Sequence, residues 1–372
     1  MTKYPSLTII RFFAAFLVFC SHYGQEMFAK LGDWAVNLFC RGGEAVILFY
    51  LLSGFLITVV YEKRVDTGLK VGKFYLARFA RIYPLYALAL VIHAPFFYRY
   101  VLGTNRELFF DANFFPAVVG MKFLMLDPYH MPLIDQSGWL LQGWSLGCEL
   151  LFYLCFPLVA KYFYNIRDSR LLVGFFAATL AAWLIHAAPL WLTVDKESTL
   201  WASRDTALQF MPPARILDFV VGVFAALVVL RLDSIRTSMA RYCGYILVLT
   251  LAFQAFSPVG LSSESWHLLV FRLLYVGLIA SLYCLDREKP YKETKLVSLG
   301  VLAGEISFAM YLFQGIVYDY VSLGIRSVLN VHLSPTLSFA VVLPILLAAC
   351  YLLHKRFELP TRDRILSGSK RV

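Results

Sequence analysis

Apolar runs of about twenty residues recur along the whole chain and are separated by short polar stretches. Each run is long enough to cross a hydrocarbon core of about 30 Å as an α-helix, which rises about 1.5 Å per residue. The pattern predicts an all-α polytopic membrane protein with about ten transmembrane helices. The predicted spans cover residues 7–25, 44–61, 81–100, 144–164, 171–192, 210–230, 242–256, 266–285, 297–321 and 335–353.

One connection departs from this pattern. Between the third and fourth spans, a further apolar stretch at 108–126 is interrupted by Asp111, Asn113 and Pro116. These interruptions favour a re-entrant or interfacial segment over a complete crossing. No internal repeat divides the chain, so residues 1–372 are expected to form a single integral-membrane domain without an appended soluble domain.

The charge distribution sets the expected orientation. Only 16% of the residues are charged and 60% are hydrophobic, yet the net charge is +10. With a cytoplasmic N-terminus, most Lys and Arg fall on the cytoplasmic side, notably in 63–81 and 355–371. This asymmetry follows the positive-inside rule. It predicts a multi-pass protein of a bacterial inner membrane, with both termini cytoplasmic and membrane lipids, rather than nucleic acid, around it. Seven scattered cysteines, without metal-ligand spacing, predict no metal site.

Ionisable side chains inside spans are the main candidates for function, because each costs about 2.5–3.5 kcal/mol at a helix centre. Arg11 and His22 lie eleven residues apart and therefore share one helix face, about 16 Å apart. With Ala15 and Val18 between them, they could line a channel for an elongated ligand. Alternatively, Arg11 reaches lipid headgroups and His22 bonds a neighbouring helix. The full set is Arg11, His22, Glu149, Arg215, Asp218, Arg272 and Glu305, with Glu44 near a rim.

Glu149 is expected at a depth similar to that of His22, near the outer end of its span. A carboxylate there could orient the imidazole and stabilise its protonated form, which suits a general base. The alternative is a structural ion pair between Glu149 and Arg215. Arg215 and Asp218 are one helical turn apart and could also form an ion pair.

Arg78 and Arg81, one turn apart at the cytoplasmic mouth of the third span, form a second candidate site. Two guanidinium groups on one helix face suit bidentate recognition of phosphate, although lipid headgroups are an equal alternative. The remaining histidines show no metal-like spacing and are assigned no role; they are His93, His130, His186, His267, His332 and His354.

Short motifs appear in a consistent order along nearly the whole chain. They are Arg11 to Ala15 followed by Ser21-His22, then Phe49 to Phe55, Arg78 to Pro84, Trp144-Ser145-Leu146 with Glu149, Phe152-Tyr153 and Pro157, Arg215 with Phe219 and Gly222, Gly304 to Phe308 with Tyr311-Leu312, and Phe357 to Pro360. In their order and spacing, the chain resembles the integral-membrane acyltransferase family 3. This family includes O-antigen, exopolysaccharide and nodulation-factor acetyltransferases.

The resemblance implies cytoplasmic acyl-CoA, with acetyl-CoA expected, as donor, and a sugar hydroxyl of an envelope, exported or lipid-linked glycan as acceptor. It implies catalytic roles for His22, Glu149 and Arg11. Donor binding then falls to Arg78, Arg81 and Arg11, and substrate binding to Trp144, Ser145 and Arg215. The route of the acyl group, direct or through a nucleophile such as Ser53, Ser145 or Cys20, stays open.

The chain departs from the family pattern at three positions. Ala45 replaces the usual glycine before the Phe-rich motif, Ile47 occupies a frequently polar site, and Gln314 replaces a late histidine. An amide cannot act as a base near neutral pH, so Gln314 does not fit a mechanism that requires two histidines.

Three other classes of membrane protein fit the sequence less well. A glycolipid transporter or flippase would use the same buried charges as a polar pathway, but it predicts a repeat that the sequence lacks. A polyprenyl-phosphate sugar transferase would need clustered outer acidic residues, whereas Asp111, Asp127 and Asp135 are dispersed. A purely structural scaffold would not explain ionisable residues within the spans.

Overall fold

The computed structural model describes residues 4–66, 70–104, 114–129, 138–165, 168, 170–171, 173–179, 181, 212–257, 266–288 and 293–368. Within these residues the regular secondary structure is entirely helical, which confirms the all-α prediction. The chain divides into two compact units. Unit 1 comprises Met1–Leu69, Cys155–Gln209 and Pro213–Ser307, and unit 2 comprises Lys70–Leu154, Phe210–Pro212 and Phe308–Val372.

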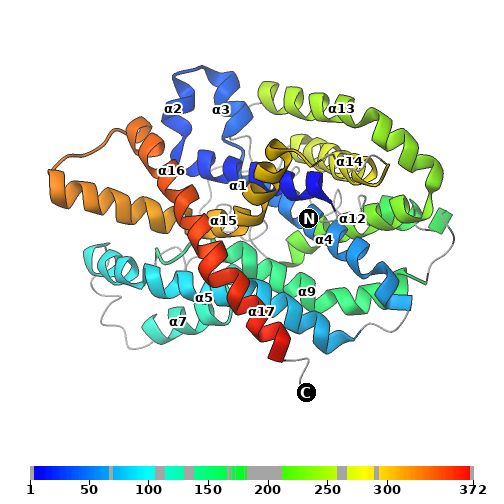
Figure 1. Cartoon of the computed structure of the whole chain (residues 1–372), viewed down its shortest axis with the longest axis horizontal. Coiled ribbons are helices and arrows are strands. Elements are labelled where there is room, and N and C mark those ends of the chain that lie inside the picture. Colours follow the sequence, from blue (N-terminus) through cyan, green and yellow to red (C-terminus); the bar gives the residue numbers. More distant parts are fainter. Residues whose placement is uncertain are drawn as a thin grey trace, which may run out of the picture. The chain divides into compact units, whose positions relative to one another are not determined.

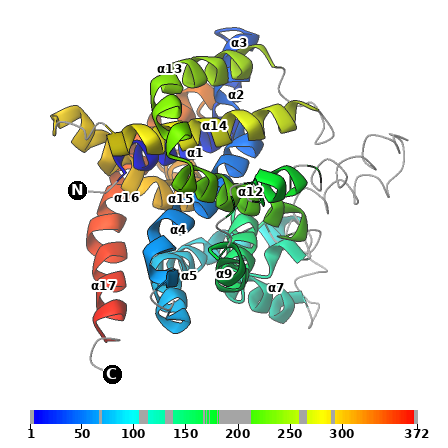
Figure 2. The same ribbon diagram turned by 90° about the vertical axis from the view of Figure 1, so that its right-hand side faces the viewer.

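Unit 1 is built around the N-terminal helices and three later ones. Its helices are α1 (Pro5–Tyr23), α2 (Gln25–Ala29), α3 (Asp33–Phe39), α4 (Gly42–Asp66), α12 (Pro212–Arg231), α13 (Asp233–Phe256) and α14 (Trp266–Glu288). Helix α13 lies along α14 in both views of the ribbon (Figures 1 and 2). Helix α1 packs against α4 and α14, and α3 packs against α13. The second half of α9 (Gly143–Phe163) and the beginning of α15 (Lys295–Leu329) complete this unit.

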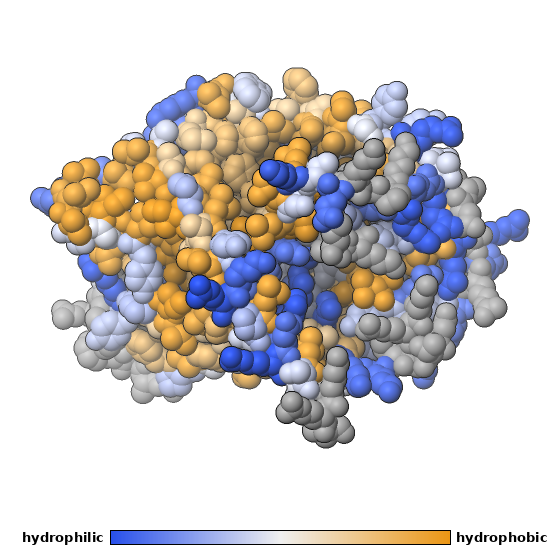
Figure 3. Space-filling model, in the orientation of Figure 1, coloured by the Kyte–Doolittle hydropathy of each residue, from blue (hydrophilic) through white to orange (hydrophobic). Residues whose placement is uncertain are grey.

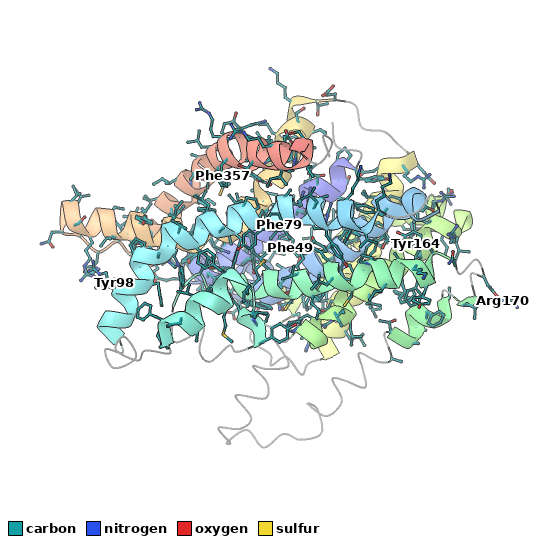
Figure 4. All side chains as sticks on the ribbon, turned by 90° about the horizontal axis from the view of Figure 1, so that it is seen from below. Phe49, Phe79, Tyr98, Tyr164, Arg170 and Phe357 are labelled. Atoms are coloured by element: carbon teal, nitrogen blue, oxygen red, sulfur yellow. The ribbon has the colours of Figure 1, made fainter. Side chains whose placement is uncertain are left out.

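Unit 2 centres on the long helix α5 (Val71–Thr104), on which Phe79 and Tyr98 are labelled in Figure 4. It also contains α7 (Phe114–Phe123), the 3-10 turn η1 (Asp127–Tyr129), the first half of α9 (Gly143–Phe163), the second half of α15, and α16 (Pro335–Leu353). A π-helical segment, η2 (His354–Glu358), joins α16 to α17 (Leu359–Gly368). Both η2 and α17 contact α5.

Among the described residues, seven helices are long and apolar enough to cross a membrane, by length and composition. They contain the predicted spans at 7–25, 44–61, 81–100, 242–256, 266–285, 297–321 and 335–353, apart from residues 24–25 and 100 and the N-terminal Trp266. The predicted spans at 144–164 and 210–230 correspond to helices α9 and α12. The predicted span at 171–192 falls largely outside the described residues. Hydrophobic side chains crowd the surface around the end of α15 and α16, as a lipid-facing surface requires (Figure 3).

The connection between α5 and α9 contains α7, a helix of ten residues. Ten residues rise about 15 Å, which is half of the hydrocarbon thickness. Helix α7 alone therefore cannot cross the membrane. Residues 105–113 lie outside the described part, so the re-entrant or interfacial character of the whole segment stays a prediction.

A buried arginine holds the α3–α4 connection against α13. The Arg41 side chain is 1% exposed, and its Nη1 lies 3.0 Å from Oε1 of Glu44. Its Nη2 donates to the carbonyl oxygens of Gln254 and Ser257 at the C-terminal end of α13. A cation suits that end of a helix, where carbonyl groups lack intrahelical partners. Arg41 is thus a structural anchor, a role that its place in the sequence did not indicate.

Two glycines allow α4 and α12 to touch through their backbones. A Cβ added at Gly54 would overlap the carbonyl of Phe219, and one added at Gly222 would overlap the carbonyl of Leu51. Close backbone approach at small residues is a general mode of helix packing in membranes. The same holds for Gly304 of α15, whose added Cβ would overlap the carbonyl of Thr8 in α1. These motif glycines therefore fix helix separations in unit 1.

We expect Gly222→Ala to lower the thermal unfolding midpoint of the purified protein. The methyl group would push α12 away from Leu51, and overpacking of this kind costs typically about 1–3 kcal/mol. The matched control is Gly244→Ala on α13, where an added Cβ meets nothing within 4 Å. The midpoint of each variant is measured in detergent by loss of monodisperse protein on heating. An equal midpoint for both variants would contradict the packing argument.

Candidate active site

Helices α5 and α9 run antiparallel in unit 2. The hydroxyl of Tyr75, near the start of α5, donates to the carbonyl of Leu154, the last residue of α9 in unit 2, at 3.1 Å. At the other end, a Cβ added to Gly143 would stand 3.3 Å from Cε2 of Tyr86. The pairing brings the arginine motif of α5 beside the glutamate motif of α9.

Tyr153 links these two motifs. The guanidinium carbon of Arg78 lies 5.7 Å from the centre of the Tyr153 ring and 5.9 Å from that of Phe74. Cations are attracted to aromatic faces at such distances. The Tyr153 hydroxyl in turn donates to Oε1 of Glu149, one turn earlier in α9. Arg78, Tyr153 and Glu149 therefore form one cluster, which we call the Tyr153 cluster.

The Tyr153 cluster corrects one expectation about depth. The sequence placed Glu149 near the outer end of one span and Arg78 at the inner mouth of another. In unit 2 both residues contact Tyr153, so they are not separated by the thickness of the membrane. Helix α5 begins at Val71, two turns before Arg78. Its antiparallel pairing with α9 therefore brings Arg78 level with the part of α9 that carries Tyr153. The predicted span had started only at residue 81.

Arg81 lies one turn after Arg78 and is partly exposed. Residues three apart are neighbours on a helix surface. Two guanidinium groups in this arrangement can bind the oxygens of phosphate groups. The candidate donor-binding residues of α5 thus include Arg78, beside Tyr153, and Arg81, one turn farther along the helix.

Ser145 belongs to a hydroxyl network at the start of α9. Its Oγ lies 2.6 Å from the Tyr311 hydroxyl, and it also donates to the carbonyl of Gln142 at 3.1 Å. Ser145 is buried and Trp144 beside it is partly exposed. Near this network Gln314 is fully buried, and its Nε2 donates to the backbone carbonyl of Tyr311. Both of these contacts join Ser145 to a hydroxyl or a carbonyl group. The role of Ser145 as a nucleophile stays a prediction.

His22 and Arg11 lie on α1 in unit 1. The His22 side chain is exposed and Arg11 is partly buried. Ala15 and Val18 between them are 0% and 2% exposed, because α1 packs against α4 and α14. The small-residue stripe is therefore packed in this structure and does not line an open channel. The roles of His22 and Arg11, and the pairing of His22 with Glu149, stay predictions.

Arg215 is paired with Asp218, as the one-turn spacing predicts, at 3.5 Å. The sequence did not indicate the third member of this group, Arg272 of α14. Its Nε lies 2.5 Å from Oδ1 of Asp218 and its Nη2 lies 3.3 Å from Oδ2. This bidentate pairing makes buried charge tolerable and joins α12 to α14. The role of Arg215 in substrate binding stays a prediction.

Two further ionisable pairs in unit 2 had no predicted role. His93 of α5 lies 3.0 Å from Asp319 of α15, and Lys122 of α7 lies 2.8 Å from Asp127. Burial of a charged side chain inside a predicted membrane segment was the available signal, but the partners could not be read from the sequence. Among the described residues, no three His, Cys, Asp or Glu side chains lie close enough together to hold a metal ion.

Comparison with known proteins defines the class of enzyme. A family model described as an acyltransferase domain matches residues 4–355, so the chain belongs to this family. It is a multi-pass membrane enzyme that transfers acyl groups, which favours this interpretation over the transporter, sugar-transferase and scaffold alternatives. No solved structure matches the chain.

Three curated relatives illustrate the range of the family. The chain is 28% identical to the acyltransferase MdmB of Streptomyces mycarofaciens over 333 residues, covering 86% of this chain and 80% of that protein. It is 28% identical to nodulation protein 10 of Rhizobium leguminosarum bv. viciae over 195 residues, covering 48% of this chain and 49% of that protein. It is also 28% identical to the exopolysaccharide production protein ExoZ of Rhizobium meliloti (strain 1021) over 193 residues, covering 50% and 52%.

Proposed function

We propose that this enzyme transfers an acyl group, expected to be acetyl, from acyl-CoA to a hydroxyl group of an envelope or exported glycan. The observation that carries the proposal is the Tyr153 cluster, in which Tyr153 connects Arg78, a residue type that binds phosphate, to the carboxylate of Glu149. The relative named for exopolysaccharide production supports a carbohydrate acceptor.

The proposed donor site uses Arg78, Arg81 and Arg11. The nucleotide part of CoA carries several phosphate charges, and arginine binds phosphate through paired N–H donors. Arg78 and Arg81 follow the basic stretch that starts at Lys63, which favours the cytoplasmic side for the nucleotide.

The proposed chemistry is an acyl transfer from CoA to the acceptor hydroxyl without a metal, and a covalent intermediate on a protein nucleophile would divide the same transfer into two steps. His22 removes the proton of the acceptor hydroxyl while its oxygen attacks the thioester carbonyl. The C–S bond then breaks, the acyl group stays on the acceptor oxygen, and CoA leaves with a proton on its sulfur. Glu149 supports the chemical step, and Trp144, Ser145 and Arg215 bind the acceptor.

The function is tested in a deletion strain. Mass spectrometry of its envelope and exported glycans should show the loss of one acyl increment, and the wild-type gene on a plasmid should restore it. Complementation with the Gly244→Ala gene, altered at an open helix position, serves as the control for expression. Unchanged acylation of all glycans in the deletion strain would overturn the glycan acceptor.

A further inference from the structure

Leu140 stands in an unusual backbone conformation directly before α9. Its φ is +46°, in the left-handed region that a side chain with a Cβ rarely adopts. Such a conformation persists only where surrounding contacts determine it, and these positions cluster at functional sites. The contacts that hold Leu140 are therefore informative.

Both backbone polar groups of Leu140 are bound by ionisable side chains. Its N–H donates to Nδ1 of His93 at 3.0 Å, and its carbonyl accepts from Nζ of Lys122 at 3.2 Å. Each of these side chains is backed by an aspartate. Nε2 of His93 lies 3.0 Å from Oδ2 of Asp319, and Nζ of Lys122 lies 2.8 Å from Oδ2 of Asp127.

The hydrogen bonds define the chemical state of His93. A backbone N–H can only donate, so Nδ1 must act as the acceptor and the proton resides on Nε2. Nε2 then donates to Asp319. With both ring nitrogens engaged, this buried imidazole has no atom available to act as a general base. Its geometry suits the holding of a backbone segment.

The segment held in this way sets the position of Trp144 and Ser145. The carbonyl of Leu140 also accepts from the N–H of Gly143 at 2.9 Å, which closes the turn into α9. Gln142 in this turn offers its carbonyl to the hydroxyls of Ser145 and Tyr311, at 3.1 and 3.4 Å. A shift at Leu140 would therefore move the hydroxyl network at the start of α9.

We propose that His93 and Asp319 are positioning residues for the acceptor side of the reaction. Through the Leu140 amide they fix the turn that presents Trp144 and Ser145, while Lys122 and Asp127 hold the Leu140 carbonyl. This inference rests on the proposed function in one respect, because that proposal assigns acceptor binding to Trp144 and Ser145. Misplacement of a binding group by about 1 Å can lower a rate about a hundredfold.

The test measures kinetics and local structure in the full-length protein in detergent. His93→Phe should lower kcat/KM for the acceptor about ten- to a hundredfold, with the affinity for acetyl-CoA unchanged. His93→Asn should recover part of this loss, because its side-chain oxygen can still accept from the Leu140 N–H. Hydrogen exchange, followed by mass spectrometry, should quicken in the segment 138–145 of His93→Phe and only slightly in that of His93→Asn.

The control is His332→Phe, which alters an exposed histidine of the same unit. If hydrogen exchange in 138–145 of His93→Phe equals that of the wild type, His93 does not hold the Leu140 turn and the proposal is overturned. Faster exchange with an unchanged kcat/KM for the acceptor would also overturn it, because the turn would then not position the acceptor site. If His93→Phe does not fold, Asp319→Ala at the partly exposed end of the pair replaces it, with the same two readouts. Failure of the wild-type enzyme to acylate any glycan would overturn the proposed function instead. The exchange measurement would still decide whether His93 holds the Leu140 turn.

Discussion

His22→Ala should abolish acyl transfer while leaving the folded protein in the membrane. Loss of a general base costs typically about 10²- to 10⁴-fold in rate, and no other histidine of α1 is available to replace His22. The side chain is exposed, so its truncation leaves no cavity in the packing of unit 1. Substitutions at such positions usually change stability by less than about 0.5 kcal/mol.

The measurement compares glycan acylation in cells with turnover of the purified enzyme. His332→Ala, a second exposed histidine, is the matched control and should retain the wild-type rate. Acylation by His22→Ala at the wild-type level would exclude His22 as the base. A folded protein with acetyl-CoA affinity retained and turnover lost is the expected result.

The positions of the helices could largely be predicted from the sequence, because lipid imposes a simple rule on apolar run length. Contacts within one helix could also be predicted from the sequence. The Arg215–Asp218 pair follows from one-turn spacing, and the structure confirms it. In both cases the decisive interactions are local along the chain.

Contacts between distant segments could not be predicted in this way. His93 and Asp319 are separated by 226 residues, and Arg272 and Asp218 by 54, so nothing in a single sequence pairs them. Gly54 and Gly222 appeared as members of motifs, but only the crossing of α4 and α12 explains why a Cβ is excluded there. The proximity of Arg78 and Glu149 was missed for a related reason, since a single sequence does not show that the first turns of α5 pair with α9.

The Tyr153 cluster allows the donor-binding and chemical roles to be separated by substitution. Arg78→Ala combined with Arg81→Ala should weaken acetyl-CoA binding, because phosphate contacts are made in the ground state as well as in the transition state. Glu149→Gln should lower kcat with donor affinity largely kept. Its side-chain oxygen can still accept from the Tyr153 hydroxyl, so the ring beside Arg78 stays in place, while the negative charge is lost.

Tyr153 itself provides the sharpest contrast. Tyr153→Phe keeps the aromatic face for Arg78 but removes the hydroxyl that donates to Glu149, so it should resemble Glu149→Gln. Tyr153→Leu also removes the face, and it should weaken acetyl-CoA binding about two- to fivefold, as expected for the loss of a cation–π contact of about 0.5–1 kcal/mol. Donor binding and single-turnover rates are measured on the same detergent-purified variants. Unchanged acetyl-CoA affinity in the double arginine variant would show that these arginines serve lipid headgroups. Equal acetyl-CoA affinity in Tyr153→Phe and Tyr153→Leu would show that the ring does not position Arg78.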